Sequence, residues 1–232
     1  MKGRIYLIPV TLGGDDFAGV IPEKALAITR KLRFFVVENI RTSRRFLRLI
    51  DKGFPIDDTV FYELNEHTKD SEIDHFLEPL NSGSDIGIMS EAGLPGIADP
   101  GARLIALAHR KRITVIPLTG PSSIILALIS SGLNGQNFSF NVYLPVEPAE
   151  RAAKLKELEK KANEGYAQIF METPYRNQKM METIFEVCNR NTLLCIAADI
   201  TLPDESIRTM RIHEWRMNVP DLSNRLVVFV LQ

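Results

Sequence analysis

A run of twelve residues, 90–101, has the composition of a ligand-binding loop. It reads Ser-Glu-Ala-Gly-Leu-Pro-Gly-Ile-Ala-Asp-Pro-Gly, and its three glycines and two prolines make a stiff backbone that can come close to a bound molecule. The run follows an apolar segment, 86–89, that is typical of a buried strand, and it precedes a segment, 102–112, with apolar residues at helical spacing. Ligands bind at the carboxyl ends of strands in open α/β sheets, so the sequence predicts a binding loop here.

Glu38 is a second candidate for chemistry, because it ends the apolar run 34–38. A carboxylate at the end of a strand can act as a base or orient a substrate. The alternative is a simple ion pair with Arg41, which follows closely in the sequence. Asp99, by contrast, precedes Pro100 at the start of a predicted helix, and we expect it to be the N-cap of that helix rather than a catalytic group.

Basic residues follow Glu38 at helical spacing. They are Arg41, Arg44, Arg45, Arg48 and Lys52. Such a stripe can hold the phosphates of a nucleic acid, and the alternative is a solvated helix face. Farther along the chain, Glu172 and Arg176 flank Pro174 after another apolar run, and this placement favours a role in a site.

The composition is that of an ordinary globular protein. The chain has 232 residues, of which 45% are hydrophobic and 25% charged, enough for one large or two modest domains. The net charge of −1 gives no overall attraction for nucleic acid, so RNA contacts must come from a local basic patch. The two cysteines lie outside any Cys-x-x-Cys spacing, the first residues do not read as a signal peptide, and no apolar run approaches the ~20 residues that span a bilayer. We therefore expect a cytoplasmic protein with free thiols and no membrane partner.

Strands and helices are predicted to alternate through the first half of the chain. The strands are predicted at residues 5–10, 34–38, 59–64, 86–89 and 114–118, and the helices at 22–31, 42–52, 72–80 and 102–112. Such alternation favours a mainly parallel sheet that is covered on both faces.

The pattern restarts after the turn at residues 119–122. Helices are predicted at 124–131, 149–163 and 177–189, the first of them ended by Gly132, and strands at 138–144 and 167–172. Three further strands, 192–199, 207–214 and 225–231, follow one another with short turns, which predicts hairpins and a mixed second sheet. The predicted fold is α/β with two domains, residues 1–117 and 118–232.

Most familiar catalytic signatures are missing from the sequence. There is no Walker A loop, no Gly-x-Gly-x-x-Gly and no Gly-x-Ser-x-Gly around a serine. The four histidines are scattered without metal-ligand spacing, so we expect no metal. A glycine- and proline-rich loop with few acid–base groups suits a reaction whose reactivity is carried by a cofactor.

Five motifs in register resemble those of the tetrapyrrole methylase superfamily. They are Ile8-Pro9-Val10-Thr11, Glu38-Asn39-Ile40-Arg41-Thr42, Ser90-Glu91-Ala92-Gly93-Leu94-Pro95 with Asp99-Pro100-Gly101, Pro117-Leu118-Thr119-Gly120-Pro121-Ser122, and Glu172-Thr173-Pro174-Tyr175-Arg176. Within the superfamily they are most similar to the branch that methylates the ribose 2′-oxygen of a cytidine in 16S ribosomal RNA. The similarity covers nearly the whole chain.

The resemblance implies two α/β domains with S-adenosylmethionine in the cleft between them, usually as a homodimer, and ribosomal RNA or the small ribosomal subunit as the partner. Together with the residue patterns above, it leads us to assign catalytic roles to Glu38, Arg41 and Glu172. Substrate-binding roles are assigned to Arg41, Arg44, Arg45 and Arg176. The residues expected to bind the cofactor are Pro9, Ser90, Glu91, Ala92, Gly93, Leu94, Ile97, Ala98, Gly120, Pro121, Ser122, Ser123 and Met171.

The chain keeps the family's cofactor-facing motifs better than its substrate-facing ones. Glu91 stands in place of an aspartate, Asn39 in place of an acidic residue and Tyr175 in place of a histidine. Residues 198–202 lack the arginine and lysine of the family's Arg-Glu-Leu-Thr-Lys. The sequence therefore predicts an S-adenosylmethionine-dependent methyltransferase that acts on 16S ribosomal RNA. Two alternatives stay open: a tetrapyrrole or other small-molecule substrate, and a non-catalytic module that binds S-adenosylmethionine or RNA.

Overall fold

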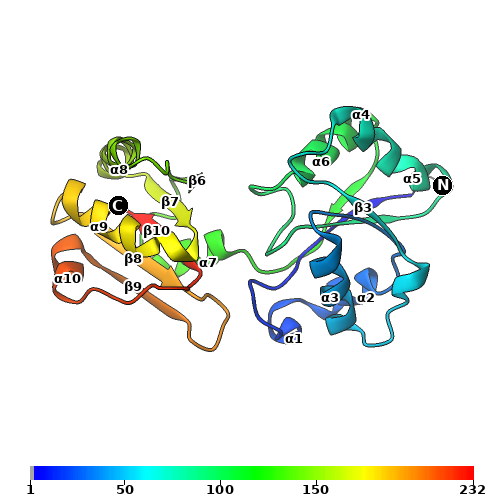
Figure 1. Ribbon diagram of the computed structural model, residues 1–232, viewed down its shortest axis with the longest axis horizontal. Coiled ribbons are helices and arrows are strands. Elements are labelled where there is room, and N and C mark those ends of the chain that lie inside the picture. Colours follow the sequence, from blue (N-terminus) through cyan, green and yellow to red (C-terminus); the bar gives the residue numbers. More distant parts are fainter. Residues whose placement is uncertain (1–2) are drawn as a thin grey trace. The chain divides into compact units, whose positions relative to one another are not determined.

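The computed structural model describes residues 3–232 and divides into two compact units, Met1–Ser122 and Ser123–Gln232 (Figure 1). The sequence predicts a domain boundary between residues 117 and 118, whereas the first compact unit runs on through the turn at 118–122. Within the described residues, no helix is both long enough and apolar enough to cross a bilayer.

Five parallel strands form the sheet of the first unit, in the order β3-β2-β4-β1-β5. They are β1 (Ile5–Ile8), β2 (Phe34–Val37), β3 (Val60–Glu63), β4 (Ile86–Met89) and β5 (Val115–Pro117). Val37 and Ile8 both lie opposite Met89, so the carboxyl ends of β2, β4 and β1 are level with one another. The predicted parallel sheet of the first domain is confirmed.

Helices cover both faces of this sheet, because each strand places successive side chains on opposite faces. The helices are α1 (Phe17–Val20), α2 (Glu23–Thr29), α3 (Ile40–Ile50), α4 (Asp70–Ile73), α5 (Glu78–Asn81) and α6 (Gly101–Arg110), with short 3-10 helices η1 (Ile56–Asp58) and η2 (Asp74–Leu77). Figure 1 shows α1, α2 and α3 on one face and α4, α5 and α6 on the other. Along β2, Phe35 and Val37 join the core with α2 and α3, while Val36 joins the core with α5 and α6.

The second unit is built on a mixed five-stranded sheet in the order β6-β7-β10-β8-β9. β6 and β7 pair in parallel, and the other neighbouring strands pair antiparallel, so the predicted mixed sheet is confirmed. The elements are α7 (Ser123–Ser131), β6 (Phe138–Tyr143), α8 (Pro148–Asn163), β7 (Ala167–Glu172), η3 (Pro174–Arg176), α9 (Asn177–Val187), β8 (Leu193–Ala198), β9 (Ser206–Arg211), α10 (Ile212–Met217) and β10 (Val227–Leu231). α7 ends before Gly132, whose φ of +71° suits the predicted helix end.

The prediction of a strand over residues 207–214 is wrong in its last part, because β9 gives way to the helix α10. The N–H of Arg211 donates to Oε2 of Glu214 at 2.7 Å and caps this helix. Ile212 and Trp215 are buried, and Nε1 of Trp215 donates to the carbonyl oxygen of Leu194 at 2.8 Å. The chain therefore returns through α10 before β10 enters the sheet between β7 and β8.

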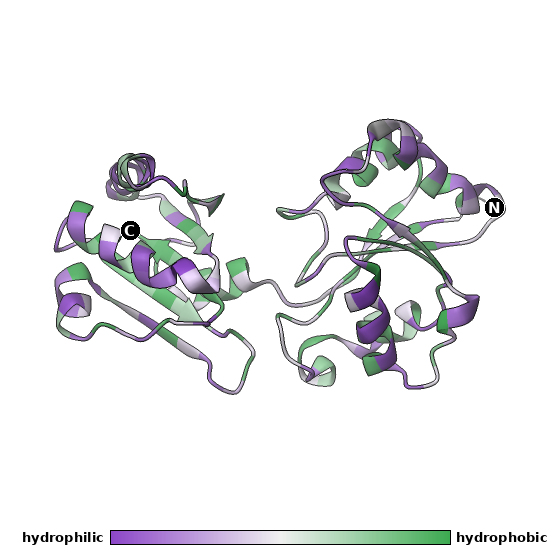
Figure 2. Ribbon diagram, viewed as in Figure 1, coloured by the Kyte–Doolittle hydropathy of each residue, from purple (hydrophilic) through white to green (hydrophobic). Residues whose placement is uncertain are grey.

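The core of the second unit lies between its sheet and the helices α8, α9 and α10. The buried positions of α8 recur every three or four residues: Arg151, Leu155, Leu158 and Ala162. In the sheet, the rings of Phe170 and Phe229 stack with their centroids 5.3 Å apart. In Figure 2 the strands of this sheet are largely green, whereas α8 carries much purple, as expected for a helix with one buried and one exposed face.

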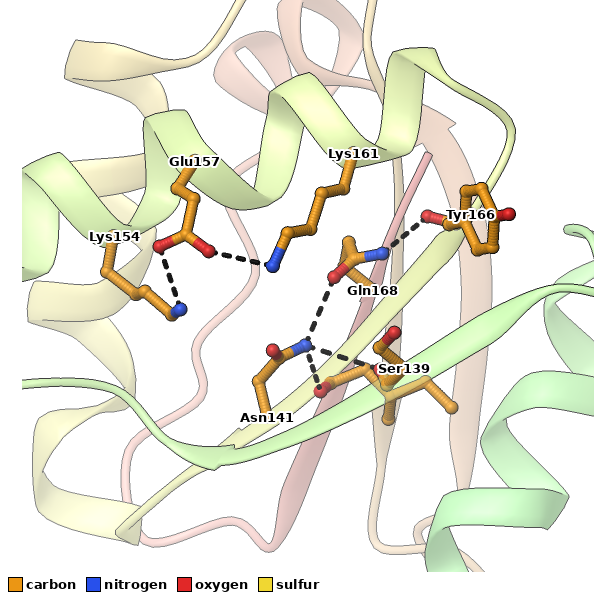
Figure 3. Close-up of polar contacts among 8 residues, drawn as sticks. Ser139, Asn141, Lys154, Glu157, Lys161, Tyr166 and Gln168 are labelled. Carbon is orange, nitrogen blue, oxygen red and sulfur yellow. Dashed lines mark hydrogen bonds and ion pairs between the residues drawn. The ribbon is translucent and has the colours of Figure 1, made fainter.

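A polar cluster holds the edge strand β6 against β7 (Figure 3). Nδ2 of Asn141 lies 3.3 Å from three acceptors, namely the carbonyl oxygens of Ser139 and Ile169 and Oε1 of Gln168. Gln168 is fully buried, and its Nε2 donates to the carbonyl oxygen of Tyr166 at 2.7 Å. These bonds accompany a bulge in β6, where Val142 has a φ of +54°.

On the solvent side of α8, Glu157 lies between Lys154 and Lys161 at 2.8 and 2.7 Å (Figure 3). Hydrogen bonds from these two ammonium groups lower the pKa of Glu157 to about 2. The three side chains form an ordinary charged helix surface.

Candidate functional site

The carboxyl edge of the first sheet gathers four of the segments that the sequence analysis singled out. Pro9, Glu38 and Ser90 each follow directly after the level ends of β1, β2 and β4. β5 ends beside them, because Pro117 lies opposite Leu7. Parallel strands run in one direction, so loops that are far apart in the sequence meet at this edge.

Three of these segments are in direct contact. A Cβ atom built on Gly120 would lie 2.1 Å from Cβ of Pro9, so the turn at 119–122 rests on Pro9. The N–H of Val10 donates to the carbonyl oxygen of Gly93 at 2.9 Å. A Cβ atom on Gly93 would lie 3.4 Å from the carbonyl oxygen of Pro121. Pro9, the start of loop 90–101 and the turn before α7 therefore form one continuous surface.

Loop 90–101 is fixed by its own backbone and by Asp99. Gly93 and Gly96 have φ values of +70° and +89°, which glycine adopts without strain, and Ala98 has a φ of +58°. The carboxylate of Asp99 accepts hydrogen bonds from the N–H groups of Gly96 and Gly101, both at 2.6 Å. These bonds lower the pKa of Asp99, but burial outweighs them and raises it above its ordinary value.

The prediction of Asp99 as the N-cap of the following helix is wrong by one residue. α6 begins at Gly101, and Pro100 occupies the N-cap position. The Asp99 side chain still accepts a hydrogen bond from the first turn of the helix, as a capping carboxylate does.

Loop 90–101 leaves apolar side chains open to a ligand. Ile97 is 43% exposed, Ala92 and Ala98 are exposed, and Leu94 is half-buried. Ser90 is buried, and its hydroxyl donates to the carbonyl oxygen of Ala92. The loop therefore offers apolar contacts from a backbone that is already fixed, as small-molecule sites commonly do.

Glu38 is half-buried and lies beside two other acids. Burial raises its pKa most, the charges of Glu91 and Asp99 raise it further, and a hydrogen bond from the Glu91 N–H opposes the rise. Within the part of the chain that the structure describes, Glu38 and Arg41 do not form the ion pair that was the alternative. A carboxylate that binds a proton more readily than usual is suited to acid–base chemistry.

The N-terminus of α3 joins this group through residues to which the sequence analysis gave no role. Oδ1 of Asn39 accepts from the N–H groups of Arg41 and Thr42 at 2.9 and 3.3 Å, so Asn39 is the N-cap. The hydroxyl of Thr42 donates to Oε1 of Glu91 at 2.5 Å. Both residues belong to the Glu-Asn-Ile-Arg-Thr motif, and the asparagine before a helical pattern was the available signal.

The basic stripe of α3 lies on the solvent side of the helix. Arg41, Arg44, Arg45 and Arg48 are exposed, whereas Ser43, Phe46, Leu47 and Ile50 are buried. The guanidinium of Arg44 lies over the ring of Phe61, 5.4 Å from its centroid. Arg45 lies 3.9 Å from Asp15, with both side chains exposed, so this ion pair contributes little. The stripe begins next to Glu38 and leads away from it along α3.

In the second unit, Met171 and Glu172 end β7, and Arg176 follows in η3. Oε2 of Glu172 lies 2.8 Å from a guanidinium nitrogen of Arg176, and these side chains are 1% and 19% exposed. Oε1 of Glu172 accepts from the N–H of Thr173 at 2.8 Å. Glu172 and Arg176 thus neutralise each other in a largely buried ion pair, while Tyr175 between them is 78% exposed.

A second ion pair lies at the same end of this sheet, because Val227 of β10 lies opposite both Glu172 and Ala198. Asp199 pairs with Arg225 at 2.6 Å. The fully buried Asn177 donates to the carbonyl oxygens of Leu222 and Arg225. The loops that follow β7, β8 and α10 are therefore tied together by polar side chains.

The predicted residues thus separate into two groups. In the first unit, the carboxyl edge of the sheet brings together Pro9, Glu38, residues 90–98 and residues 120–122. Arg41, Arg44 and Arg45 lie exposed on α3, which begins at this edge. Ser123 begins α7, and Met171, Glu172 and Arg176 lie in the second unit. Among the described residues, no three or more histidine, cysteine or acidic side chains are arranged to hold a metal ion.

Known proteins resemble the chain over almost all of its length. The family model described as Tetrapyrrole (Corrin/Porphyrin) Methylases matches residues 4–215. A Vibrio cholerae protein named Ribosomal RNA small subunit methyltransferase I is 29% identical over 95% of this chain and 73% of its own length. Proteins of the same name from Pseudomonas aeruginosa and Escherichia coli O157:H7 are each 28% identical, over 92% and 97% of this chain and 73% and 74% of their own lengths.

A solved structure shares the fold. The crystal structure of the methyltransferase CobJ has a TM-score of 0.63 to this chain and covers 99% of it and 93% of itself, at 17% sequence identity. The match of the family model over residues 4–215 shows the relationship directly. This chain belongs to the tetrapyrrole (corrin/porphyrin) methylases, a family of S-adenosylmethionine-dependent methyltransferases.

Proposed function

We propose that the chain transfers a methyl group from S-adenosylmethionine to a ribose hydroxyl of small-subunit ribosomal RNA. One observation supports the location of the site. Pro9, loop 90–101 and the turn at 119–122 meet at the carboxyl edge of the first sheet, beside Glu38 and the basic stripe of α3. The choice of RNA rests on the relatives, which are named as methyltransferases of this RNA and match 92–97% of the chain.

The residues at this edge fit the donor. Gly120 and Gly93 let the loops after β5 and β4 pack closely on Pro9 and Leu12, where a Cβ atom would intrude. Leu94 and Ile97 offer apolar contacts for an adenine ring. The carboxylate of Glu91 is exposed and suits a ribose or a sulfonium. S-adenosylmethionine, when bound, supplies the activated methyl group. The roles predicted for Ser123 and Met171 toward the donor stay predictions.

The chain's own residues would then prepare the acceptor. Glu38 accepts the proton that the ribose hydroxyl loses as its oxygen takes the methyl group, and S-adenosylhomocysteine is the second product. The raised pKa of Glu38 favours this role, because its carboxylate holds a proton more readily than an exposed glutamate does. Arg41, Arg44 and Arg45 are exposed on α3 and would hold RNA phosphates, which orients the strand without selecting its sequence.

In the second unit, the two predicted site residues Glu172 and Arg176 are charged but largely buried. Glu172 and Arg176 already pair with each other, so an RNA phosphate competes with Glu172 for Arg176. We therefore propose that Glu172 holds Arg176 in place, while the exposed arginines of α3 make the phosphate contacts. The proposed target, by resemblance of the five motifs, is the 2′-oxygen of a cytidine in 16S ribosomal RNA. Action as a homodimer in the cytoplasm is part of the same proposal.

Methyl transfer from labelled S-adenosylmethionine tests the proposal. Small ribosomal subunits, naked ribosomal RNA and a set of tetrapyrroles are offered in parallel, and calorimetry with S-adenosylmethionine and S-adenosylhomocysteine measures donor binding. We expect label in the RNA, at a ribose that resists alkaline cleavage. Label in a tetrapyrrole alone contradicts the RNA substrate, and donor binding without any transfer indicates a non-catalytic module. Sedimentation analysis of the same protein tests the dimer.

A further inference from the structure

Two loops of the first unit lie next to each other because the strands that precede them are neighbours. β2 leads through Glu38 into α3, and β4 leads through Ser90 into loop 90–101. Val37 and Met89, the last residues of these strands, lie opposite each other in the sheet. Side chains of one loop can therefore bond to the other.

One hydrogen bond between side chains crosses from α3 to loop 90–101: the hydroxyl of Thr42 donates to Oε1 of Glu91 at 2.5 Å. Glu91 in turn acts on Glu38, because its charge raises the pKa of Glu38 and its backbone N–H lowers it. We call Glu38, Thr42 and Glu91 the clasp. Thr42 lies in the first turn of α3, where Asn39 is the N-cap, and negative charge is favoured at a helix N-terminus.

The rest of loop 90–101 is held by other bonds. Gly93 bonds to Val10, and the Asp99 carboxylate bonds to Gly96 and Gly101. The clasp supplies the contact of the loop's first turn with α3. It also determines where the charge of Glu91 sits relative to Glu38.

We propose that Thr42 is a positioning residue of the candidate active site, whose hydroxyl holds the carboxylate of Glu91 beside Glu38 and keeps loop 90–101 docked on α3. The part of this proposal that concerns catalysis rests on the proposed function. Burial is the first cause of the raised pKa of Glu38, and the charges of Glu91 and Asp99 are the others that raise it. The position of Glu91 therefore bears on how readily Glu38 takes up a proton.

Two residues of this chain suit the clasp. Glu91 has one methylene more than the aspartate it stands in for, which extends its reach toward Thr42. Asn39 caps α3 with a neutral side chain, so it adds no further carboxylate beside Glu38 and Glu91. An acid at position 39 would add like charge to a site that already holds three carboxylates.

Three variants isolate the Thr42 hydroxyl. Thr42→Val removes the donor at nearly constant volume, and Thr42→Ser keeps it. Ser43→Ala is the matched control, because the Ser43 hydroxyl bonds to the carbonyl oxygen of Asn39 in the same helix turn. The Glu38 carboxyl is titrated by ¹³C NMR and assigned with Glu38→Gln. Near-ultraviolet circular dichroism confirms that each variant is folded.

We expect the Glu38 midpoint to fall toward its ordinary value of 4.5 in Thr42→Val, because the Glu91 charge is no longer held beside it. Thr42→Ser and Ser43→Ala should keep the midpoint of the unsubstituted chain. An unchanged midpoint in Thr42→Val overturns the proposal, and so does an equal shift in Thr42→Ser or Ser43→Ala.

Methyl transfer supplies the catalytic readout. In Thr42→Val we expect the acidic limb of the profile of kcat against pH to move to lower pH together with the titration midpoint of Glu38. We also expect the KM for S-adenosylmethionine to rise several-fold. A lower kcat without movement of the limb indicates a merely structural role and overturns the catalytic part. If the unsubstituted chain transfers no methyl group to any substrate, the proposed function fails, while the NMR titration still decides whether the clasp exists.

Discussion

Glu38 and Glu172, two acids assigned to catalysis, lie in opposite electrostatic surroundings. Glu38 is half-buried beside Glu91 and Asp99, and like charges and burial raise its pKa. Glu172 is buried against Arg176, at 2.8 Å, and accepts a further hydrogen bond from Thr173. Glu38 is the acid suited to proton transfer, because its pKa is raised. The carboxylate oxygens of Glu172 are taken up by Arg176 and Thr173, so Glu172 is suited to hold Arg176.

Replacement of Glu38 by glutamine is predicted to lower the kcat of methyl transfer by about 10²–10⁴-fold, the usual contribution of a positioned base. The acidic limb of the pH profile, which lies above pH 4.5 in the unsubstituted chain because the pKa of Glu38 is raised, should disappear. Donor affinity by calorimetry is the control and should change little. A variant that retains full kcat, or the same acidic limb, would contradict the role of Glu38.

The raised pKa of Glu38 also predicts how stability depends on pH. The folded protein binds this proton more tightly than the unfolded chain, so the stabilisation is fully present below about pH 4.5 and is lost as pH rises through the folded pKa. Asp99, whose pKa is also raised, adds to the same trend. Urea unfolding between pH 4 and 8 should therefore show Glu38→Gln gaining stability relative to the unsubstituted chain as pH rises. A constant difference across this range would show that the pKa of Glu38 is not raised by folding.

At the scale of elements, the candidate site depends on how closely the loops after β1, β4 and β5 approach one another. Gly120 is the tightest of these contacts, because a Cβ atom there would overlap the ring of Pro9. The proline ring is rigid and cannot move aside without moving β1. The loops therefore form one surface only while position 120 has no side chain.

Substitution of Gly120 by alanine is predicted to weaken S-adenosylmethionine binding at least tenfold and to lower the free energy of unfolding by about 1–3 kcal/mol, as overpacking does. Calorimetry and urea unfolding measure the two effects. Gly135→Ala is the matched control, because no atom lies within 4 Å of a Cβ built there. Equal donor affinity in Gly120→Ala and Gly135→Ala would remove this turn from the binding surface.

The helix α3 has a buried face in the core and an exposed face of arginines. If these arginines hold phosphates, Arg45→Ala should weaken RNA binding several-fold and reduce the slope of log K against log salt by about 0.7–0.9, the contribution of one phosphate contact. Lys160→Ala removes the same charge from the exposed side of α8 and should leave the slope unchanged. Equal slopes for the two variants would indicate that α3 is only a solvated surface.

At the scale of the whole molecule, each compact unit has a core of its own. The second unit surrounds Phe170 and Phe229 with α8, α9 and α10, and it contains the chain's single tryptophan, Trp215. Trp215 is buried and hydrogen-bonded to Leu194, so its fluorescence reports the packing of this unit.

Truncation of Phe170 to alanine is predicted to lower the free energy of unfolding of the second unit by about 3–5 kcal/mol, since the side chain is fully buried and leaves a cavity. Urea unfolding followed by Trp215 fluorescence measures the change. Phe138→Ala removes the same side chain from a position that is 41% exposed and should cost much less. Equal losses for the two variants would mean that burial does not determine the contribution of Phe170.

The sequence by itself determined the local elements and the family. The apolar runs and turn residues predicted the strands and most of the helices, because periodicity and capping act between residues that are close in the chain. The helix α1 was not predicted, and the single helix predicted at 72–80 is divided into α4, η2 and α5. The prediction also failed at residues 212–217, because the strand predicted over 207–214 ends at Arg211 and the helix α10 follows. Ile212 and Trp215, three residues apart, are both buried on one face of this helix.

The tertiary structure decided which of the candidate residues meet. The strand order β3-β2-β4-β1-β5 puts Glu38, Glu91 and Thr42 within hydrogen-bonding reach, although 49 residues separate Thr42 from Glu91. Because β1 and β5 are neighbours in this order, Gly120 after β5 packs against Pro9 after β1. Strand order follows from the joint packing of two cores on opposite faces of one sheet, and no short stretch of sequence contains that information.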